Sequence, residues 1–148
     1  MAKRVLFLCT GNYYRSRFAE ILFNALACQS ELDWSADSRG LAIELVPLNG
    51  GALSPVARQG LAERGIALAE PPRPPRALRE DDLRRAQRVI ALNRTEHHPY
   101  LKKQFPAWAD RVEYWHVSDL DRAPAEQALG EIEQHVHALI GYLRVARQ

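Results

Sequence analysis

The chain has 148 residues, enough for one ordinary domain with a buried core, and 47% of them are apolar. Its formal charge of +2 comes from 20 basic and 18 acidic side chains, which is too balanced for the basic surface of a typical nucleic-acid-binding protein. No apolar stretch approaches the length of a membrane-spanning helix, and the short N-terminal run RVLFL lacks the longer apolar region of a signal peptide. We therefore expect a cytoplasmic protein.

The N-terminal half predicts strands and helices in alternation. Residues 5–8 form an apolar run that is typical of a buried strand. Apolar residues recur at helical spacing over 16–28, which predicts an amphipathic helix. Residues 33–40 predict a second strand that ends in a glycine turn, followed by a loop. Ser54 and Pro55 then supply an N-cap and a first-turn proline for a helix that ends near residue 64.

The C-terminal half continues the alternation after a proline-rich segment. Residues 70–76, EPPRPPR, hold four prolines and must be extended, either as a linker or as a surface loop. We expect a surface loop because too little chain flanks the segment for two domains. Beyond it we expect a short helix, a buried strand, a helix that Pro99 could divide into two pieces, a fourth strand and a closing helix. These elements lie at 80–86, 88–92, 95–105, 112–117 and 125–147.

Alternating strands and helices predict a three-layer α/β fold within a single domain over residues 1–148. The expected core is a four-stranded, twisted parallel sheet of flavodoxin-like order 2-1-3-4, with helices on both faces. Ligands of such sheets bind beyond the carboxyl ends of the strands. Cys9, Asn93 and Asp119 all fall at such ends, so we expect the functional site there.

The segment CTGNYYRS, residues 9–16, joins the first predicted strand to the first predicted helix. A loop of this kind turns backbone N–H groups inward and adds the positive end of the helix, which makes an anion-binding nest. Gly11 permits the tight conformation, and Arg15 can return its planar fork to two anion oxygens. The same field favours a thiolate at Cys9, the nucleophile that phosphoryl transfer to sulfur requires, and Ser16 could donate to that sulfur. Alternatively, Cys9 could be only a small buried hydrophobe, since the Cys-x5-Arg spacing alone is weak.

The loop resembles that of the low-molecular-weight protein tyrosine phosphatases, which runs Cys-x-Gly-Asn-x-Cys-Arg-Ser-Pro after the first strand. The segments ADSRG, RALREDDL followed by VIALN, and HVSDLDRAP extend the resemblance over most of the chain. It implies Cys9 as nucleophile, Arg15 as transition-state clamp and Asp119 as general acid, with Asp121 as a rival acid. Ser38 would support the loop. The resemblance further implies that the phosphate is bound by Thr10, Gly11, Asn12, Tyr13, Tyr14 and Ser16.

Several positions depart from the family pattern. Tyr14 replaces the second loop cysteine, so the family's protective disulfide cannot form, and we expect Cys28 to be a core residue. Tyr13 could supply an aromatic wall for the substrate or pack behind the loop. The family's proline after the loop, its aspartate after the third strand and the proline and aromatic pair after the general acid are also replaced. The residues at these positions are Arg17, Asn93, Leu120, Asp121 and Arg122.

Two further residue types could suggest other sites. The five histidines lack a ligand-like spacing with carboxylates or cysteines, so we expect them to be solvated and expect no metal. The arginines between 73 and 88 are expected to form a solvated face, which could attract acidic phosphoprotein segments.

We therefore expect a cysteine-dependent phosphomonoester hydrolase, in the first place a protein-tyrosine phosphatase, that forms a cysteinyl phosphate and uses no cofactor. Its partners would be phosphorylated proteins or small phosphomonoesters, with no nucleic acid or membrane, and the protein would be a monomer or weak dimer. Two alternatives stay open. One is an arsenate reductase coupled to a small thiol, and the other is an anion-binding regulator with weak turnover.

Overall fold

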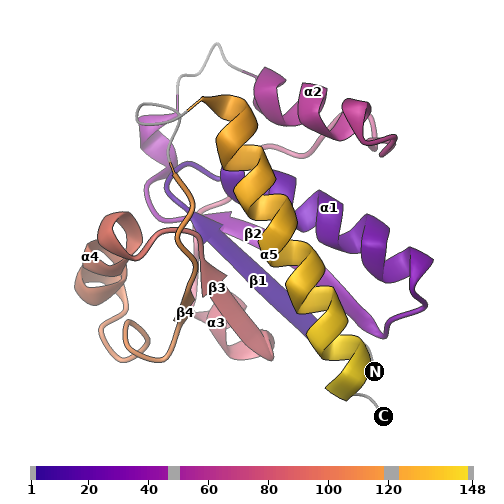
Figure 1. Cartoon of the computed structure of the whole chain (residues 1–148). Helices are drawn as coiled ribbons and strands as arrows, with labels where there is room; N and C mark the ends of the chain where they lie inside the picture. The colour runs from indigo at the N-terminus through magenta and orange to yellow at the C-terminus, as the bar shows by residue number, and fades with distance from the viewer. Residues whose placement is uncertain (1–2, 47–50, 119–123, 147–148) are drawn as a thin grey trace.

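The computed structural model describes residues 3–46, 51–118 and 124–146. Four parallel strands form one sheet of order β2-β1-β3-β4, which confirms the predicted order (Figure 1). The strands are β1 (Lys3–Cys9), β2 (Trp34–Gly40), β3 (Arg88–Ala91) and β4 (Glu113–Tyr114). The helices are α1 (Arg15–Gln29), the 3-10 helix η1 (Ile43–Leu45), α2 (Pro55–Glu63), α3 (Glu80–Arg85), α4 (Arg94–Gln104) and α5 (Ala125–Ala146).

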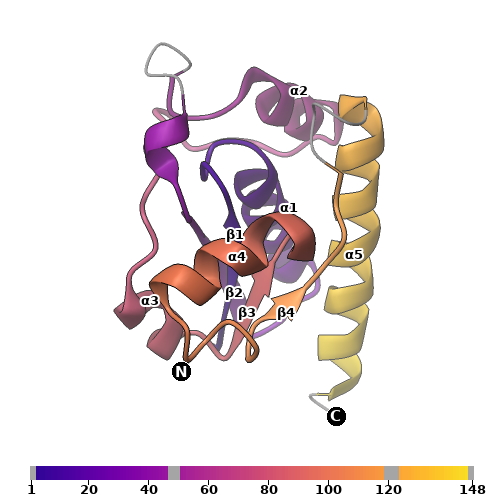
Figure 2. The same cartoon turned by 90° about the vertical axis from the view of Figure 1, so that its left-hand side faces the viewer.

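Strand β1 lies inside the sheet and contributes to the core on both faces. Alternate side chains of a strand point to opposite faces. Val5 and Phe7 belong to the larger core, which the apolar faces of α1, α2 and α5 complete. Leu6 and Leu8 belong to a second core, to which α3 and α4 contribute Leu83 and Leu101. Figures 1 and 2 show the resulting three layers, with α1 and α5 on one face of the sheet and α3 and α4 on the other.

The outer edge of β2 is closed by side chains and by an extended segment. Asn24 of α1 accepts a hydrogen bond from the backbone N–H of Ala36 at 2.7 Å and donates one to its carbonyl at 3.1 Å. Farther along the edge, the Gly40 N–H donates to the carbonyl of Arg76, and the Leu78 N–H donates to the carbonyl of Gly40. The end of the proline-rich segment therefore runs beside β2, as expected of a surface loop.

Three local predictions differ from the structure. Strand β4 has two residues instead of the six expected, because only Glu113 and Tyr114 pair with β3. Helix α4 continues through Pro99 as one piece, although proline removes one hydrogen bond from the turn. The segment after β2 forms η1, which the sequence pattern did not predict. Within the described residues, no helix combines the length and the apolar character that crossing a membrane requires.

Candidate functional site

The loop after β1 is held against the end of β2. The Leu41 N–H donates to the Cys9 carbonyl at 3.0 Å, and the Ala42 N–H donates to the Thr10 carbonyl at 2.8 Å. A Cβ atom on Gly40 would lie 2.9 Å from the Thr10 carbonyl oxygen, so only glycine allows this close approach. The loop therefore leads directly from the carboxyl end of the sheet into the first turn of α1, where helix N–H groups favour an anion.

Asn12 stabilises the loop from within. Its φ of +52° lies in the left-handed region, and its side chain is fully buried. The amide nitrogen donates to the hydroxyls of Ser16 and Ser38, both at 2.9 Å. The amide oxygen accepts from Arg73 Nη1 and from the Arg76 backbone N–H, both at 3.0 Å. All four hydrogen-bonding positions of the amide are therefore used, which fixes both its orientation and the loop conformation.

Cys9 and Ser16 are in direct contact within the loop. Cys9 is 3% exposed, and its Sγ lies 2.9 Å from the Ser16 hydroxyl oxygen. That oxygen also accepts a hydrogen bond from Asn12 Nδ2 at 2.9 Å, and either the thiol or the hydroxyl can donate in the contact between Cys9 and Ser16. The sulfur therefore lies beside the first turn of α1, the end of a helix at which bound anions are stabilised.

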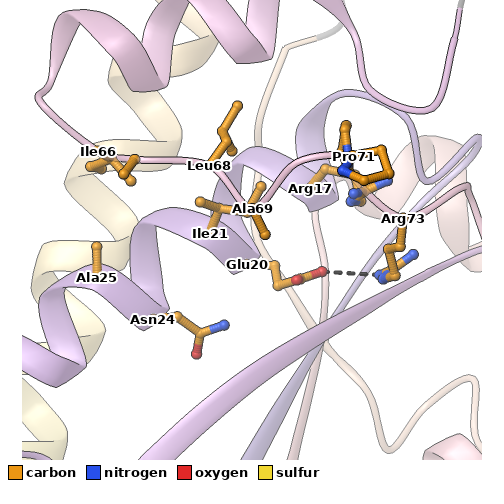
Figure 3. A pocket seen from close by; sticks show the side chains of 12 residues that line it. Arg17, Glu20, Ile21, Asn24, Ala25, Ile66, Leu68, Ala69, Pro71 and Arg73 are labelled. Atoms are coloured by element: carbon orange, nitrogen blue, oxygen red, sulfur yellow. Dashed lines mark hydrogen bonds and ion pairs between the residues drawn. The ribbon is translucent and has the colours of Figure 1, made fainter.

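Arg73 and Glu20 brace the loop from outside. Ser38 donates its hydroxyl proton to Glu20 Oε1 at 2.5 Å, and Arg73 Nη2 donates to the same carboxylate at 3.0 Å. Arg73 Nη2 also donates to the hydroxyl and the carbonyl oxygen of Ser38, at 3.0 and 2.9 Å. Figure 3 shows Glu20 on α1 pointing toward Arg73. A continuous chain of hydrogen bonds therefore joins the proline-rich segment to Asn12 and, through Ser16, to Cys9.

A pocket of about 520 Å³ adjoins this brace, between α1 and residues 66–73 (Figure 3). Its lining includes Arg17, Glu20 and Arg73 but not Cys9, so the pocket is separate from the loop of residues 9–16, called the reactive loop below. Arg17 is 2% exposed and donates through Nη1 to the Ala52 carbonyl at 3.0 Å. Burial, reinforced by the charge of Arg73, lowers the pKa of Arg17. The arginine at the family's proline position therefore ties α1 to the segment before α2.

Glu96 lies in the first turn of α4, on the face of the sheet opposite to α1 (Figure 2), and contacts the loop from there. Its Oε2 accepts from Arg15 Nη2 at 2.5 Å and from the Thr10 hydroxyl, and it lies 3.0 Å from His97 Nε2. Burial alone would raise the pKa of Glu96, but the hydrogen bonds from His97, Arg15 and Thr10 outweigh it and hold the pKa well below its usual range. These hydrogen bonds favour the anionic form of Glu96 beside the arginine of the loop, Arg15.

Aromatic and aliphatic side chains pack around the loop. Tyr14 is buried and belongs to the larger core, and Tyr13 is half-buried and packs against that core. Tyr13 thus packs behind the loop, one of its two expected placements. Val46 lies over Gly11, where a Cβ atom would meet its Cγ2 at 2.5 Å. Leu45 of η1 is 64% exposed beside this contact.

The structure brings together nine of the residues predicted for the site. Eight of them belong to the loop, and Ser38 contacts it from β2. Asp119, Leu120, Asp121 and Arg122 lie outside the described residues. The loop residues are Cys9, Thr10, Gly11, Asn12, Tyr13, Tyr14, Arg15 and Ser16.

Three expectations were wrong. Cys28 is exposed, because the buried stripe of α1 runs through its neighbour Ala27. His97 is fully buried against the loop and is not solvated. Arg73 is a loop brace and not part of a solvated face. No cluster of potential metal ligands occurs among the residues that the structure describes.

Sequence reasoning also missed the roles of Glu20 and Glu96. Glu20 follows Ser16 by about one helical turn, which places both side chains on one face of α1. Glu96 follows Asn93 by three residues, the position at which a helix cap receives a backbone N–H, and Asn93 does cap α4 in this way at 3.0 Å. Those spacings place the side chains locally but do not show which distant residue they contact.

Comparison with known proteins identifies the family. The family described as Low molecular weight phosphotyrosine protein phosphatase matches residues 4–147. A protein-arginine-phosphatase of Bacillus subtilis (strain 168) is 33% identical over 108 residues, which are 73% of this chain and 67% of the relative. The crystal structure of a low molecular weight protein tyrosine phosphatase from T. tengcongensis aligns with a TM-score of 0.74 at 30% identity, over 99% of this chain and 100% of that one.

A second solved structure, YfkJ from Bacillus subtilis, shares the fold with a TM-score of 0.83 at 22% identity, over 100% of this chain and 98% of that one. Both likenesses extend over the whole sheet and its helices, and the family match includes the reactive loop and α5. The chain therefore belongs to the low-molecular-weight phosphotyrosine protein phosphatase family, and it is a phosphatase.

Proposed function

We propose that the chain hydrolyses phosphorylated protein side chains through a covalent intermediate on Cys9. The sulfur attacks phosphorus, the bond from phosphorus to the leaving atom breaks, and water then cleaves the phosphorus–sulfur bond to release phosphate. Arg15 would bind two oxygens of the transferring group in a bidentate manner. The observation that carries the proposal is the 2.9 Å contact between Cys9 Sγ and the Ser16 hydroxyl at the N-terminus of α1.

Asp119 is the proposed general acid, and the residues before it support this assignment. The Val117 N–H donates to the Leu92 carbonyl, and Asn93 Nδ2 donates to the Val117 carbonyl at 3.0 Å. The chain that leads to Asp119 is therefore attached at the carboxyl end of β3, the same end of the sheet as Cys9. An acid there would protonate the leaving oxygen, and its carboxylate would next activate the attacking water.

Phosphotyrosine in proteins is the first candidate substrate, in line with the family description and the T. tengcongensis structure. Protein phosphoarginine is a second candidate. The Bacillus subtilis relative named for that activity favours it, as does a carboxylate at the loop, that of Glu96 against Arg15. Anionic groups would favour a guanidinium beside the phosphate over a neutral aryl ring.

The direct test compares kcat/KM on two peptides of one sequence, phosphorylated on tyrosine in one and on arginine in the other. EDTA is present throughout. Wild-type protein should hydrolyse at least one of them, and Cys9→Ser should hydrolyse neither while it still binds phosphate or vanadate, because the nest and Arg15 remain. Turnover that persists in Cys9→Ser would eliminate the covalent mechanism. The ratio of the two wild-type values decides between the candidate substrates.

The acid is tested by its dependence on the leaving group. Para-nitrophenolate leaves readily without a proton, whereas a tyrosine oxygen does not. Asp119→Asn should therefore slow phosphotyrosine cleavage much more than para-nitrophenyl phosphate cleavage, and Asp121→Asn should do neither. The opposite result would move the acid to Asp121.

Arsenate reduction finds less support in the structure. A reductase that passes oxidation along its own chain needs a second thiol near the first. Cys28 stands near the far end of α1, roughly 20 Å along the helix from Arg15 at 1.5 Å per residue. Only a reductase that recruits a free small thiol is compatible with this spacing, and arsenate turnover with added glutathione would reveal it.

A further inference from the structure

One oxygen of Glu96 collects three hydrogen bonds from two separate parts of the chain. Arg15 and Thr10 belong to the reactive loop, and His97 belongs to α4. The Arg15 side chain is 5% exposed and the Glu96 side chain is 28% exposed. A charged hydrogen bond of 2.5 Å between two side chains with so little solvent exposure is strong and geometrically well defined.

His97 contacts the Glu96 carboxylate from the α4 side, and its contacts select one tautomer of the ring. Its Nδ1 lies 3.1 Å from the Asn93 backbone N–H, which can only donate. The neutral ring therefore carries its proton on Nε2, and that N–H is directed to Glu96 and to the Thr10 hydroxyl oxygen at 3.2 Å. The ring is fully buried, so water does not compete for these bonds.

The helix that carries Glu96 is itself anchored to the sheet. Asn93 accepts a hydrogen bond from the Glu96 backbone N–H at 3.0 Å and donates one to the Val117 carbonyl at 3.0 Å. Leu101, about one turn after His97 on α4, is buried in the second core. The carboxylate thus projects from a helix anchored to the sheet toward the long side chain of Arg15.

We propose that Glu96, held by His97, is the positioning residue for Arg15, and that it pre-orders the guanidinium for the transferring phosphoryl group. This inference rests on the proposed Cys9-dependent hydrolysis. A free arginine side chain has many rotamers, and ordering it at each turnover would cost binding free energy. A guanidinium ordered in advance contributes its hydrogen bonds fully to the transition state.

A competing interpretation is that Glu96 occupies Arg15 and must be displaced by the substrate. The two interpretations predict opposite effects when the carboxylate is removed. A positioning carboxylate supports kcat, so its loss slows turnover. A competing carboxylate weakens phosphate binding, so its loss tightens binding and speeds turnover at low substrate concentration.

The experiment compares Glu96→Ala and Glu96→Gln with the matched control Glu133→Gln. Glu133 of α5 forms a similar half-buried ion pair with Arg64, at 3.0 and 3.2 Å, away from the reactive loop. The measurements are kcat and KM on para-nitrophenyl phosphate, the inhibition constants of vanadate and inorganic phosphate, and Tm. Vanadate resembles the five-coordinate transition state, whereas phosphate resembles the ground state.

We expect Glu96→Ala to lower kcat about 100-fold, the scale of a misplaced reacting group, with KM near the wild-type value. Its affinity for vanadate should fall much more than its affinity for phosphate. Glu96→Gln keeps an uncharged acceptor and should recover part of the loss. Glu133→Gln should leave kcat and both inhibition constants unchanged, whatever its effect on Tm.

An unchanged or higher kcat in Glu96→Ala would overturn the proposal in favour of competition. Equal losses of vanadate and phosphate affinity, with a fall in Tm beyond that of the control, would reduce Glu96 to a structural role. If Glu96→Ala does not fold, the vanadate-to-phosphate ratio of Glu96→Gln decides. Binding of the two anions requires no turnover, so an inactive wild-type protein would contradict the proposed function and still leave Glu96 testable.

Discussion

Replacing Arg73 with methionine tests whether the proline-rich segment belongs to the reactive site. Methionine is similar in length and apolar, so it keeps much of the packing and removes the guanidinium. The substitution deletes the hydrogen bonds from Arg73 to Asn12, to both oxygens of Ser38 and to Glu20. It leaves Asn12 in the left-handed conformation with one acceptor bond fewer.

The size of the effect follows from burial. The Arg73 side chain is 20% exposed and that of Glu20 is 16% exposed, so solvent screens the pair only in part. Hydrogen bonds to charged groups contribute about 1.5–3 kcal/mol each when measured alone, and those that share one donor do not add fully. We expect a loss of about 2–3 kcal/mol in the free energy of unfolding, which is a fall in Tm of about 5–10 °C for a chain of this size.

Activity should fall further than stability explains. Asn12 contacts Ser16, and Ser16 contacts the Cys9 sulfur, so a looser Asn12 would misplace the proposed nucleophile. We expect kcat on para-nitrophenyl phosphate to fall about 10- to 100-fold at a temperature where the variant is fully folded. The assays are thermal unfolding followed by circular dichroism and steady-state kinetics on the same samples.

Arg76→Met is the matched control. Arg76 lies in the same segment and also bonds Asn12, but through its backbone N–H, while its side chain is exposed. Losing that side chain should change Tm by less than about 2 °C and leave kcat unaltered, since exposed positions contribute little. Equal effects from the two substitutions would refute the brace, because they would trace the loss to the positive charge of the segment and not to the hydrogen bonds of Arg73.

Three further predictions concern the ionised and reactive groups of the site. Arg15→Lys keeps the charge but loses the planar fork, so kcat/KM should fall by the equivalent of at least about 2 kcal/mol; an unchanged kcat/KM would mean that Arg15 does not bind the phosphate. Peroxide should oxidise Cys9 beyond sulfenic acid without a disulfide to protect it, so thiol reductants should restore little activity; a Cys9–Cys28 disulfide in mass spectra with full recovery would contradict this. The pKa of Glu96 is lower in the folded than in the unfolded protein, so its contribution to stability is present above the unfolded pKa of about 4.3 and is lost as pH falls toward the folded pKa. Glu96→Gln should therefore flatten the fall in Tm below about pH 4.5, and a fall identical to that of wild type would show that another carboxylate is responsible.

The sheet and its helices could be predicted because their patterns are local and strong. Residues 5–8 are apolar without interruption, as a strand covered on both faces must be, and the structure buries Val5 and Phe7 on one face and Leu6 and Leu8 on the other. Strand β4 lies at the edge of the sheet and pairs over only two residues, so its apolar pattern overstated its length. Apolar periodicity reports burial and does not report pairing.

The contacts around the reactive loop, in contrast, could not be predicted from local sequence patterns. Glu96 contacts Arg15 across 81 positions, and Arg73 contacts Asn12 across 61. Each is a charged residue in a polar stretch, where a solvated side chain has the same local sequence as a buried ion pair. Only the packing of α4 and of the extended segment against the loop separates the two cases.

The proline-rich segment shows how the fold offsets the cost of the loop. Asn12 has a left-handed backbone conformation that most residues avoid, and the loop buries several polar side chains. Both features cost free energy unless other parts of the chain support them with hydrogen bonds. Arg73 supplies that support from a segment that has neither helical nor strand hydrogen bonds of its own along most of its length. Prolines on both sides of Arg73 limit the conformations of the unfolded segment, which lowers the entropy lost when the side chain is placed. By this reasoning the prolines stabilise the reactive site, although none of them belongs to it.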